Sequence, residues 1–208
     1  LGVRTARAVN HLRATLMAGF TTIRDLGTEG AGYADAELKQ AVDGGIIPGP
    51  RMLVATRAIV ATGSYGPKGF SLEWRVPQGA EEADDTTLVR VVRDQIGHGA
   101  DWIKIYADYR WGTQGAAPTF SLEELKLVVE TAKSANVPVA AHATTAEGMR
   151  RATLAGVETI EHGDGGTPEV FRLMKERGVA LCPTLAIAGA NTEKKRAVFK
   201  EALAAGVT

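Results

Sequence analysis

An α/β fold with parallel strands is predicted for this chain of 208 residues, because strand-like and helix-like patterns alternate along almost its whole length. The strand-like segments are short, continuous apolar runs, as expected when helices cover both faces of a sheet. Each is followed by a segment that can form the crossover to the next parallel strand. Two architectures fit this pattern, an open doubly wound sheet and a (β/α)8 barrel.

Six strands and seven helices are predicted in chain order. The strands are expected at residues 20–26, 51–60, 101–107, 138–143, 157–162 and 179–186. The helices are expected at residues 4–18, 33–43, 85–97, 121–135, 145–154, 167–177 and 192–205. Residues 61–82 are rich in Gly, Pro and Ser and are predicted to form a long loop, which in a compact domain is more often functional than structural filler.

Residues at the ends of these segments support the helix boundaries. Gly19 and Gly44 follow helical patterns, where glycine tolerates a left-handed cap. Ser121 and Glu124 have the spacing of a capping box. Pro168 sits in the first turn of its helix, where proline is favoured.

The charge balance argues against an electrostatic nucleic-acid binder. Lys+Arg and Asp+Glu both number 24, so the formal net charge is zero, and no basic stripe is found. No apolar run approaches the roughly 20 residues that a membrane helix needs. The single cysteine, Cys182, cannot form an internal disulfide and is expected to be a small buried residue. Neither a nucleic acid nor a membrane is therefore expected as a partner.

One domain spanning residues 1–208 is predicted, because no linker or low-complexity tract interrupts the pattern. The chain begins at Leu1 without a methionine or a signal sequence and stops at Thr208, just after a helical pattern. We therefore expect a piece of a longer protein, truncated at both ends. The compartment is left open, with a cytoplasmic location favoured over export, and so is a homo-oligomeric state.

Polar residues recur where the predicted strands end, and this favours the barrel. The fingerprints G-x-G-x-x-G and G-x-x-x-x-G-K-[ST] of nucleotide-binding open sheets are absent. In a barrel, the carboxyl ends of the strands converge on one active-site mouth. The polar residues at these ends are Asp25, Lys104, Asp108, His142, His162 and Asp164. With six strands the barrel would be incomplete.

Lys104 lies in mid-strand between two isoleucines, in the segment DWIKIYAD. Because side chains alternate along a strand, Trp102, Lys104, Tyr106 and Asp108 share one face. Burial of an unpaired ammonium is costly, so Lys104 must be paired, deprotonated or chemically modified. The alternative is that its side chain extends to the barrel rim.

His142 and His162 end two consecutive predicted strands. A single histidine in such a place is commonly a hydrogen-bonded core residue, whereas two at equivalent positions point to a shared role. Small residues, Ala143 and Gly163, follow them and leave room at the mouth. Neutral imidazole is a frequent metal ligand and suits zinc, so both metal ligation and a core role stay open at this point.

Five segments, in order along nearly the whole chain, resemble a known family: GFTTIRDLG (19–27), GPRMLVATRAIVATG (49–63), GADWIKIYAD (99–108), VAAHATTAEGMRRATLAGVETIEHGD (139–164) and MKERGVALCPTL (174–185). Together they resemble the amidohydrolase superfamily, and most closely the branch of imidazolonepropionase-like enzymes and bacterial metallo-dipeptidases that cleave Xaa-Pro or Xaa-Arg. The resemblance implies a metal-bearing (β/α)8 barrel of which this chain would hold about strands two to seven.

The resemblance also implies a site with two divalent metal ions, zinc being the expected metal. It makes Lys104, carboxylated by CO2, the ligand that bridges both ions, and His142 and His162 the ligands of one of them. As a carbamate, Lys104 is an anion, and the difficulty of a buried cation disappears. These three residues are the expected catalytic and metal-binding groups. The implied reaction is attack of a metal-activated water on a small amide, a dipeptide or a cyclic amide.

Two alternatives stay open. In a mononuclear deaminase or imidazolonepropionase-type hydrolase, Lys104 would be unmodified. In a metal-free barrel fragment, the chain would have a structural or binding role only. The HxH motif of the family's first strand and the aspartate after its last strand are not found in the 208 residues, so this piece alone is expected to be inactive.

Four further residues are candidates for supporting roles. The loop segment TGSYG (62–66) stands where dipeptidase relatives have a T-G-G-H-G-type segment, and Tyr65 occupies the histidine position. Tyr65 and Tyr106 are therefore candidates for contact with substrate. Asp25 and Asp164 are expected to orient metal ligands, as carboxylates near metal sites commonly do.

Overall fold

The computed structural model describes the chain from residue 1 to 208 except for residues 67–70, 72, 75–78, 112–113 and 188–191. The strands are β1 (Thr22–Asp25), β2 (Arg51–Val54), β3 (Ile59–Val60), β4 (Glu81–Glu82), β5 (Ile103–Tyr106), β6 (Asp108–Arg110), β7 (Ala116–Pro118), β8 (Val139–Ala143), β9 (Thr159–His162) and β10 (Ala180–Cys182). The helices are α1 (Gly2–Met17), α2 (Ala34–Asp43), α3 (Asp85–Gly97), α4 (Leu122–Lys133), α5 (Ala146–Ala155), α6 (Pro168–Arg177) and α7 (Thr192–Ala204), with a 3-10 turn at Leu185–Ile187.

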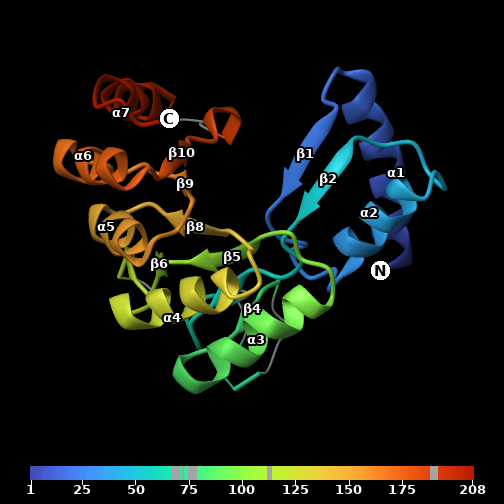
Figure 1. Cartoon of the computed structure of the whole chain (residues 1–208), viewed down its shortest axis with the longest axis horizontal. Helices are drawn as coiled ribbons and strands as arrows, with labels where there is room; N and C mark the ends of the chain where they lie inside the picture. The colour runs from blue at the N-terminus through green and yellow to red at the C-terminus, as the bar shows by residue number, and fades with distance from the viewer. Residues whose placement is uncertain (67–70, 72, 75–78, 112–113, 188–191) are drawn as a thin grey trace.

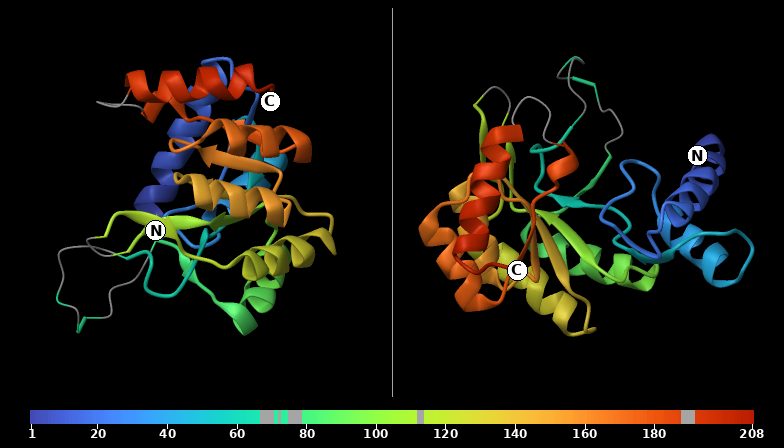
Figure 2. Two further views of the ribbon diagram at one scale, coloured as in Figure 1. Left: turned by 90° about the vertical axis from the view of Figure 1, so that its left-hand side faces the viewer. Right: turned by 90° about the horizontal axis from the view of Figure 1, so that it is seen from above.

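The strands form an arc, with helices α3 to α7 along its outside (Figure 1). Six strands make one sheet in the order β10-β9-β8-β5-β3-β4, and β1 pairs with β2 in a second sheet. All pairings in these two sheets are parallel, as predicted, and β6 and β7 form a separate antiparallel pair. Helices α1 and α7 lie on opposite sides of the strands (Figure 2). This is the arrangement of a partial (β/α)8 barrel, and it confirms the predicted fold class.

The predicted strand 51–60 is wrong in one respect, because it is two strands. β2 ends at Val54 and pairs with β1, whereas β3 begins at Ile59 and pairs with β5. Between them Thr56 has a φ of 59°, which breaks the extended backbone. The Thr56 N–H donates to the buried Asp35 carboxylate at 2.8 Å, and this contact with α2 holds the unusual conformation.

The last predicted strand also ends early. β10 stops at Cys182, and Thr184 has a φ of 45°, after which a 3-10 turn begins at Leu185. Proline at position 183 has no N–H to continue a ladder, which is a physical reason for this end. Cys182 is partly rather than fully buried.

The core forms between the six-stranded sheet and its helices. Its largest side chains include Leu88, Phe120, Met149, Ile160 and Phe171, all fully buried. Burial of this apolar surface is the main force that holds the helices against the sheet.

The predicted helix starts are confirmed at two helices. The Ser121 hydroxyl accepts from the Glu124 N–H, and the Glu124 carboxylate accepts from the Ser121 N–H, so both halves of the capping box form. Pro168 opens α6 after the Thr167 cap. No helix in the described part of the chain has the length and apolarity needed to cross a membrane.

Candidate functional site

Three adjacent parallel strands bring the predicted residues Lys104, His142 and His162 together. In the strand register, Lys104 of β5 lies beside Ala140 of β8, and Ala143 of β8 lies beside His162 of β9. The centroids of the two imidazole rings are 4.7 Å apart in an edge-to-face arrangement. The three side chains therefore belong to one site at the carboxyl ends of the strands.

Lys104 is buried rather than extended to the rim, with 4% of its surface exposed. Its neighbours along β5, Ile103 and Ile105, are fully buried on the other face, as the alternation predicted. Burial lowers the pKa of Lys104 to about 8, although the charge of Glu161 acts in the opposite direction. Within the described residues no hydrogen bond or ion pair holds the Lys104 ammonium, and its Nζ lies 5.6 Å from the Tyr106 ring centroid. The amine is thus readily available in its neutral form.

Burial favours the neutral form of both imidazoles. Burial lowers the pKa of His142 to about 3, and the neighbouring His162 and Lys104 add to the effect. Burial likewise lowers the pKa of His162, with further contributions from Lys104 and Lys195. Neutral imidazole is the form that binds a metal ion.

The orientation of His162 is fixed by residues from the end of β10 and from α7. The His162 Nδ1 lies 2.8 Å from the Thr184 hydroxyl. Lys195 donates to the same hydroxyl and to the Pro183 carbonyl, both at 3.3 Å. His162 itself has a φ of 76°, a conformation that costs energy in a non-glycine residue and is frequent at functional sites. With Nδ1 engaged, Nε2 is the nitrogen left for a ligand.

Asp108 lies next to His142 and is held by hydrogen bonds within the chain. It is fully buried, and its carboxylate accepts hydrogen bonds from the N–H groups and hydroxyls of Thr144 and Thr145 at 2.7–3.1 Å. These residues lead into α5, so the carboxylate also faces the positive end of a helix. Its Oδ1 lies 3.7 Å from the His142 Nε2. The sequence marked Asp108 only as a polar strand end, not as a site residue.

Three tyrosines, Tyr65, Tyr106 and Tyr109, form a cluster over His142, which we call the tyrosine cluster. The ring centroids are 5.0–5.6 Å apart, and the Tyr106 ring stacks on His142 at 4.6 Å. The carboxylate of Glu29 accepts from the hydroxyls of Tyr65 at 2.6 Å and Tyr106 at 3.4 Å. Burial raises the pKa of both phenols, as does Glu29, so they stay protonated as donors. Both tyrosines proposed for substrate contact thus lie at the site.

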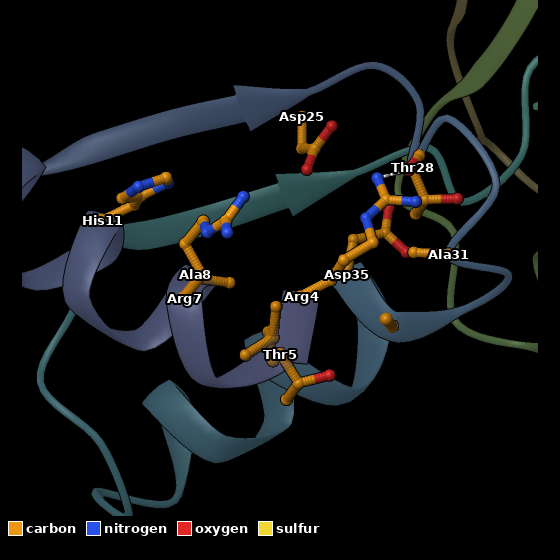
Figure 3. Close-up of a pocket in the computed structure, with 11 residues that line it drawn as sticks. Arg4, Thr5, Arg7, Ala8, His11, Asp25, Thr28, Ala31 and Asp35 are labelled. Carbon is orange, nitrogen blue, oxygen red and sulfur yellow. Dashed lines mark hydrogen bonds between the residues drawn. The ribbon is translucent and has the colours of Figure 1, made fainter. Parts of the chain in front are cut away.

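Asp25 lies at the end of β1 and lines a pocket of about 300 Å³ together with residues of α1 and α2. Figure 3 shows Arg7 and His11 of α1 on the opposite side of this pocket from Asp25. Burial raises the pKa of Asp25, partly offset by the N–H of Gly27. In the described structure no hydrogen bond joins Asp25 to Lys104 or to either histidine of the site.

Asp164 pairs with Lys195 at 2.7 Å rather than contacting His162 through a hydrogen bond. Lys195 in turn donates to the Thr184 hydroxyl, and Thr184 contacts His162 directly. Sequence reasoning missed Thr184 and Lys195, because the sequence predicts Thr184 inside the strand 179–186 and Lys195 on a helix.

A second feature missed from the sequence is an ion pair inside the barrel. Arg24 of β1 contacts Glu161 of β9 at 2.8 Å, and Thr159 accepts from the same guanidinium at 3.0 Å. The signal that was available is an arginine within an apolar strand and a glutamate directly before His162. Buried charges of this kind occur in pairs, because either alone would be costly.

The side chains of the site meet part of what a divalent metal ion needs. Across the described ranges, no group of three or more His, Cys, Asp or Glu side chains is placed to hold a metal. His142 and His162 supply two neutral nitrogens, and a carbamate on Lys104 would supply anionic oxygens as the third ligand. The residues present could therefore supply some, but not all, of the ligands of a divalent metal site.

Comparisons with known proteins match this picture. The family profile described as "Amidohydrolase family" matches residues 4–208. The ochratoxinase of Aspergillus niger is 32% identical over 206 residues, which cover 88% of this chain and 41% of that protein. The crystal structure of a prolidase complexed with N-methylphosphonate-L-proline is similar with a TM-score of 0.85 and 31% identity, over 99% of this chain and 57% of that one. The crystal structure of a Xaa-Pro dipeptidase with bound methionine in the active site is similar with a TM-score of 0.85 and 31% identity. This match covers 98% of this chain and 57% of that one.

The chain thus spans 41% of the ochratoxinase and 57% of each of these two structures. The family predicted from the five sequence segments is confirmed by both kinds of comparison. On the match over residues 4–208, this chain belongs to the amidohydrolase family.

Proposed function

We propose that this chain carries part of the active site of a metal-dependent hydrolase that cleaves a carbon–nitrogen bond in a small amide, a dipeptide or a cyclic amide. The observation that carries the proposal is the meeting of Lys104, His142 and His162 from three adjacent parallel strands. The prolidase, dipeptidase and ochratoxinase relatives support a reaction at an amide bond.

In this proposal His142 and His162 would hold one divalent ion, and Lys104, as a carbamate, would supply anionic oxygen ligands to this ion and to a second. A bound metal ion supplies Lewis acidity, polarising the amide carbonyl and lowering the pKa of water. Zinc fits neutral imidazole nitrogens and carboxylate-type oxygens.

The protein's own residues prepare this site. Thr184 holds the His162 ring through Nδ1, and the Tyr106 ring stacks on His142 and limits its rotation. The neutral Lys104 amine, which burial favours, is the form that reacts with CO2 to give a carbamate. Tyr65 and Tyr106 present hydroxyl groups at the mouth, where a substrate enters.

The test uses the protein that carries this chain, with metal content measured by inductively coupled plasma mass spectrometry and hydrolysis followed on a dipeptide panel. We expect bound zinc or a similar divalent metal, and the loss of both metal and hydrolysis in His142→Ala and His162→Ala. His11→Ala is the matched control, because His11 is exposed on α1. A protein with no bound metal and with hydrolysis indifferent to chelators would contradict the proposal.

Native mass spectrometry separates the binuclear form from the mononuclear alternative. We expect a CO2 adduct that is absent in Lys104→Met. An unmodified Lys104 in an active, metal-loaded protein would favour the mononuclear hydrolase instead.

A further inference from the structure

Glu29 places a carboxylate at the mouth of the site, separated from His142 by one aromatic ring. Its Oε1 accepts from the Tyr106 hydroxyl at 3.4 Å, and the ring of the same tyrosine stacks on His142 at 4.6 Å. Its Oε2 accepts from the Tyr65 hydroxyl at 2.6 Å. Tyr106 therefore contacts both the carboxylate and His142.

The negative charge of Glu29 has no cation of its own. In the portion of the chain that the structure describes, no Lys, Arg or His side chain lies within ion-pair distance of its carboxylate, and the residue is exposed. A carboxylate has about four acceptor positions, of which the two phenols use two. The tyrosine cluster adds aromatic rings, whose negative faces also attract cations. The free acceptor positions of Glu29, together with the rings of the tyrosine cluster, suit a positively charged hydrogen-bond donor.

The loop that carries Glu29 is held in place. Glu29 has a φ of 48°, and its carbonyl accepts from the Arg4 guanidinium at 2.9 Å. The flanking residues are fixed as well, since Thr28 donates to the Thr56 carbonyl at 2.9 Å and Gly30 to the Gly79 carbonyl at 3.0 Å. A strained residue that its surroundings hold in this way is typical of functional positions.

We propose that Glu29 is the subsite for an ammonium group of the substrate, and that this group is the free α-amino group of a dipeptide. In a dipeptide the α-amino group is separated from the carbonyl of the peptide bond by a single carbon. A carboxylate that holds this amine beside Tyr106 therefore directs the bond to be cleaved toward His142 and His162. The same contact rejects substrates whose amino group is acylated. This inference rests on the proposed function for its substrate, but its binding test does not need hydrolysis.

The first experiment measures binding of three small amides by calorimetry to the protein that carries this chain. L-alaninamide has a free α-amino group, N-acetyl-L-alaninamide has none, and N-acetyl-L-lysinamide has an ammonium only at its side-chain end. We expect L-alaninamide to bind at least tenfold more tightly than both acetylated amides. Glu29→Gln should reduce its affinity roughly 10- to 100-fold, the effect of losing a charge-assisted hydrogen bond. Glu176→Gln, at an exposed position on α6, is the control for loss of one negative charge.

The second experiment compares kcat/KM for alanyl-proline and N-acetyl-alanyl-proline. We expect the wild-type preference for the free amine to disappear in Glu29→Gln through a fall in kcat/KM for alanyl-proline alone.

Equal affinities of wild type and Glu29→Gln for L-alaninamide would overturn the inference even where hydrolysis is normal. Glu29-dependent binding of the lysinamide alone would overturn the α-amino assignment. Glu29-dependent binding of L-alaninamide without hydrolysis of any dipeptide would support this subsite and contradict the proposed function.

Discussion

Arg24 on β1 donates to Glu161 on β9 at 2.8 Å, although 137 positions separate the two residues in the chain. β1 belongs to the two-stranded sheet and β9 to the six-stranded sheet, so this pair joins the two sheets through the interior. The guanidinium also lies 4.6 Å from the Trp102 ring centroid, over the aromatic face. The pair therefore helps to hold the two sheets of the partial barrel together.

Replacement of Glu161 by alanine is expected to destabilise the protein by about 2–3 kcal/mol. The change removes the carboxylate partner of the Arg24 guanidinium. The side chain of Glu161 is 5% exposed and that of Arg24 is 21% exposed. Because Arg24 is partly exposed, the loss of stability is smaller than for a fully buried pair. Urea unfolding measures the effect. Arg172→Ala, which breaks an exposed pair on α6, is the control and should leave stability unchanged. Similar losses of stability in both variants would show that the interior pair stabilises the protein no more than the exposed pair does.

Thr184→Val is expected to weaken metal binding roughly 10- to 100-fold without unfolding the protein. The substitution keeps the side-chain shape but removes the oxygen that lies 2.8 Å from the His162 Nδ1. Competition with a chelator of known affinity measures the change. Thr153→Val removes a buried hydroxyl that bonds only within α5 and is the matched control. Unchanged metal affinity in Thr184→Val would mean that other contacts orient His162.

In the metal-free protein, the free energy of unfolding is expected to rise with pH between about 8 and 10.5. The pKa of Lys104 is lowered from 10.5 to about 8 by burial, so in this range the unfolded chain binds the proton more tightly than the folded chain. The destabilisation caused by burying the charged Lys104 ammonium is fully present below about pH 8 and disappears as the pH rises toward 10.5. It amounts to roughly 3 kcal/mol. Urea unfolding at several pH values measures it.

Lys104→Met should lack this increment, and the difference between the two proteins isolates Lys104 from other groups that titrate in the same range. Added bicarbonate should also flatten the wild-type profile, because a carbamate is not a buried cation. Parallel profiles of wild type and Lys104→Met would contradict the buried, unpaired amine.

Gly148→Ala is expected to destabilise the protein by about 1–3 kcal/mol. A Cβ on Gly148 would collide with the carboxylate of Asp108, which is fully buried and bonded to Thr144 and Thr145. Thermal and urea unfolding measure the loss. Gly97→Ala at the end of α3 is the control, because a Cβ there meets nothing within 4 Å. It should change stability by less than about 1 kcal/mol, in the favourable direction.

The sequence predicts the parallel strands and their order well, because apolar runs and capping residues are local signals. The division of segment 51–60 could not be predicted, since the backbone of Thr56 depends on Asp35, which is distant in sequence. Strands β4, β6 and β7 have only two or three residues, too few for a periodic pattern.

The site shows the same division between local and distant signals. Lys104, His142 and His162 could be predicted because the ends of parallel strands meet. Glu29 and Lys195 could not, because one lies in a loop and the other on a helix, and only the folded chain places them beside the site. The assignments of these residues to metal and substrate stay predictions that the experiments above test.

The buried carboxylate of Asp108 has a consequence for how a ligand would be acquired. It ties the start of β6 to Thr144 and Thr145, which directly follow the end of β8, through contacts made entirely within the chain. The conformational entropy of ordering this strand end is thus lost during folding and not during binding. Uptake and release of an ion at this corner should therefore be limited by exchange of its water ligands, with little rearrangement of the backbone.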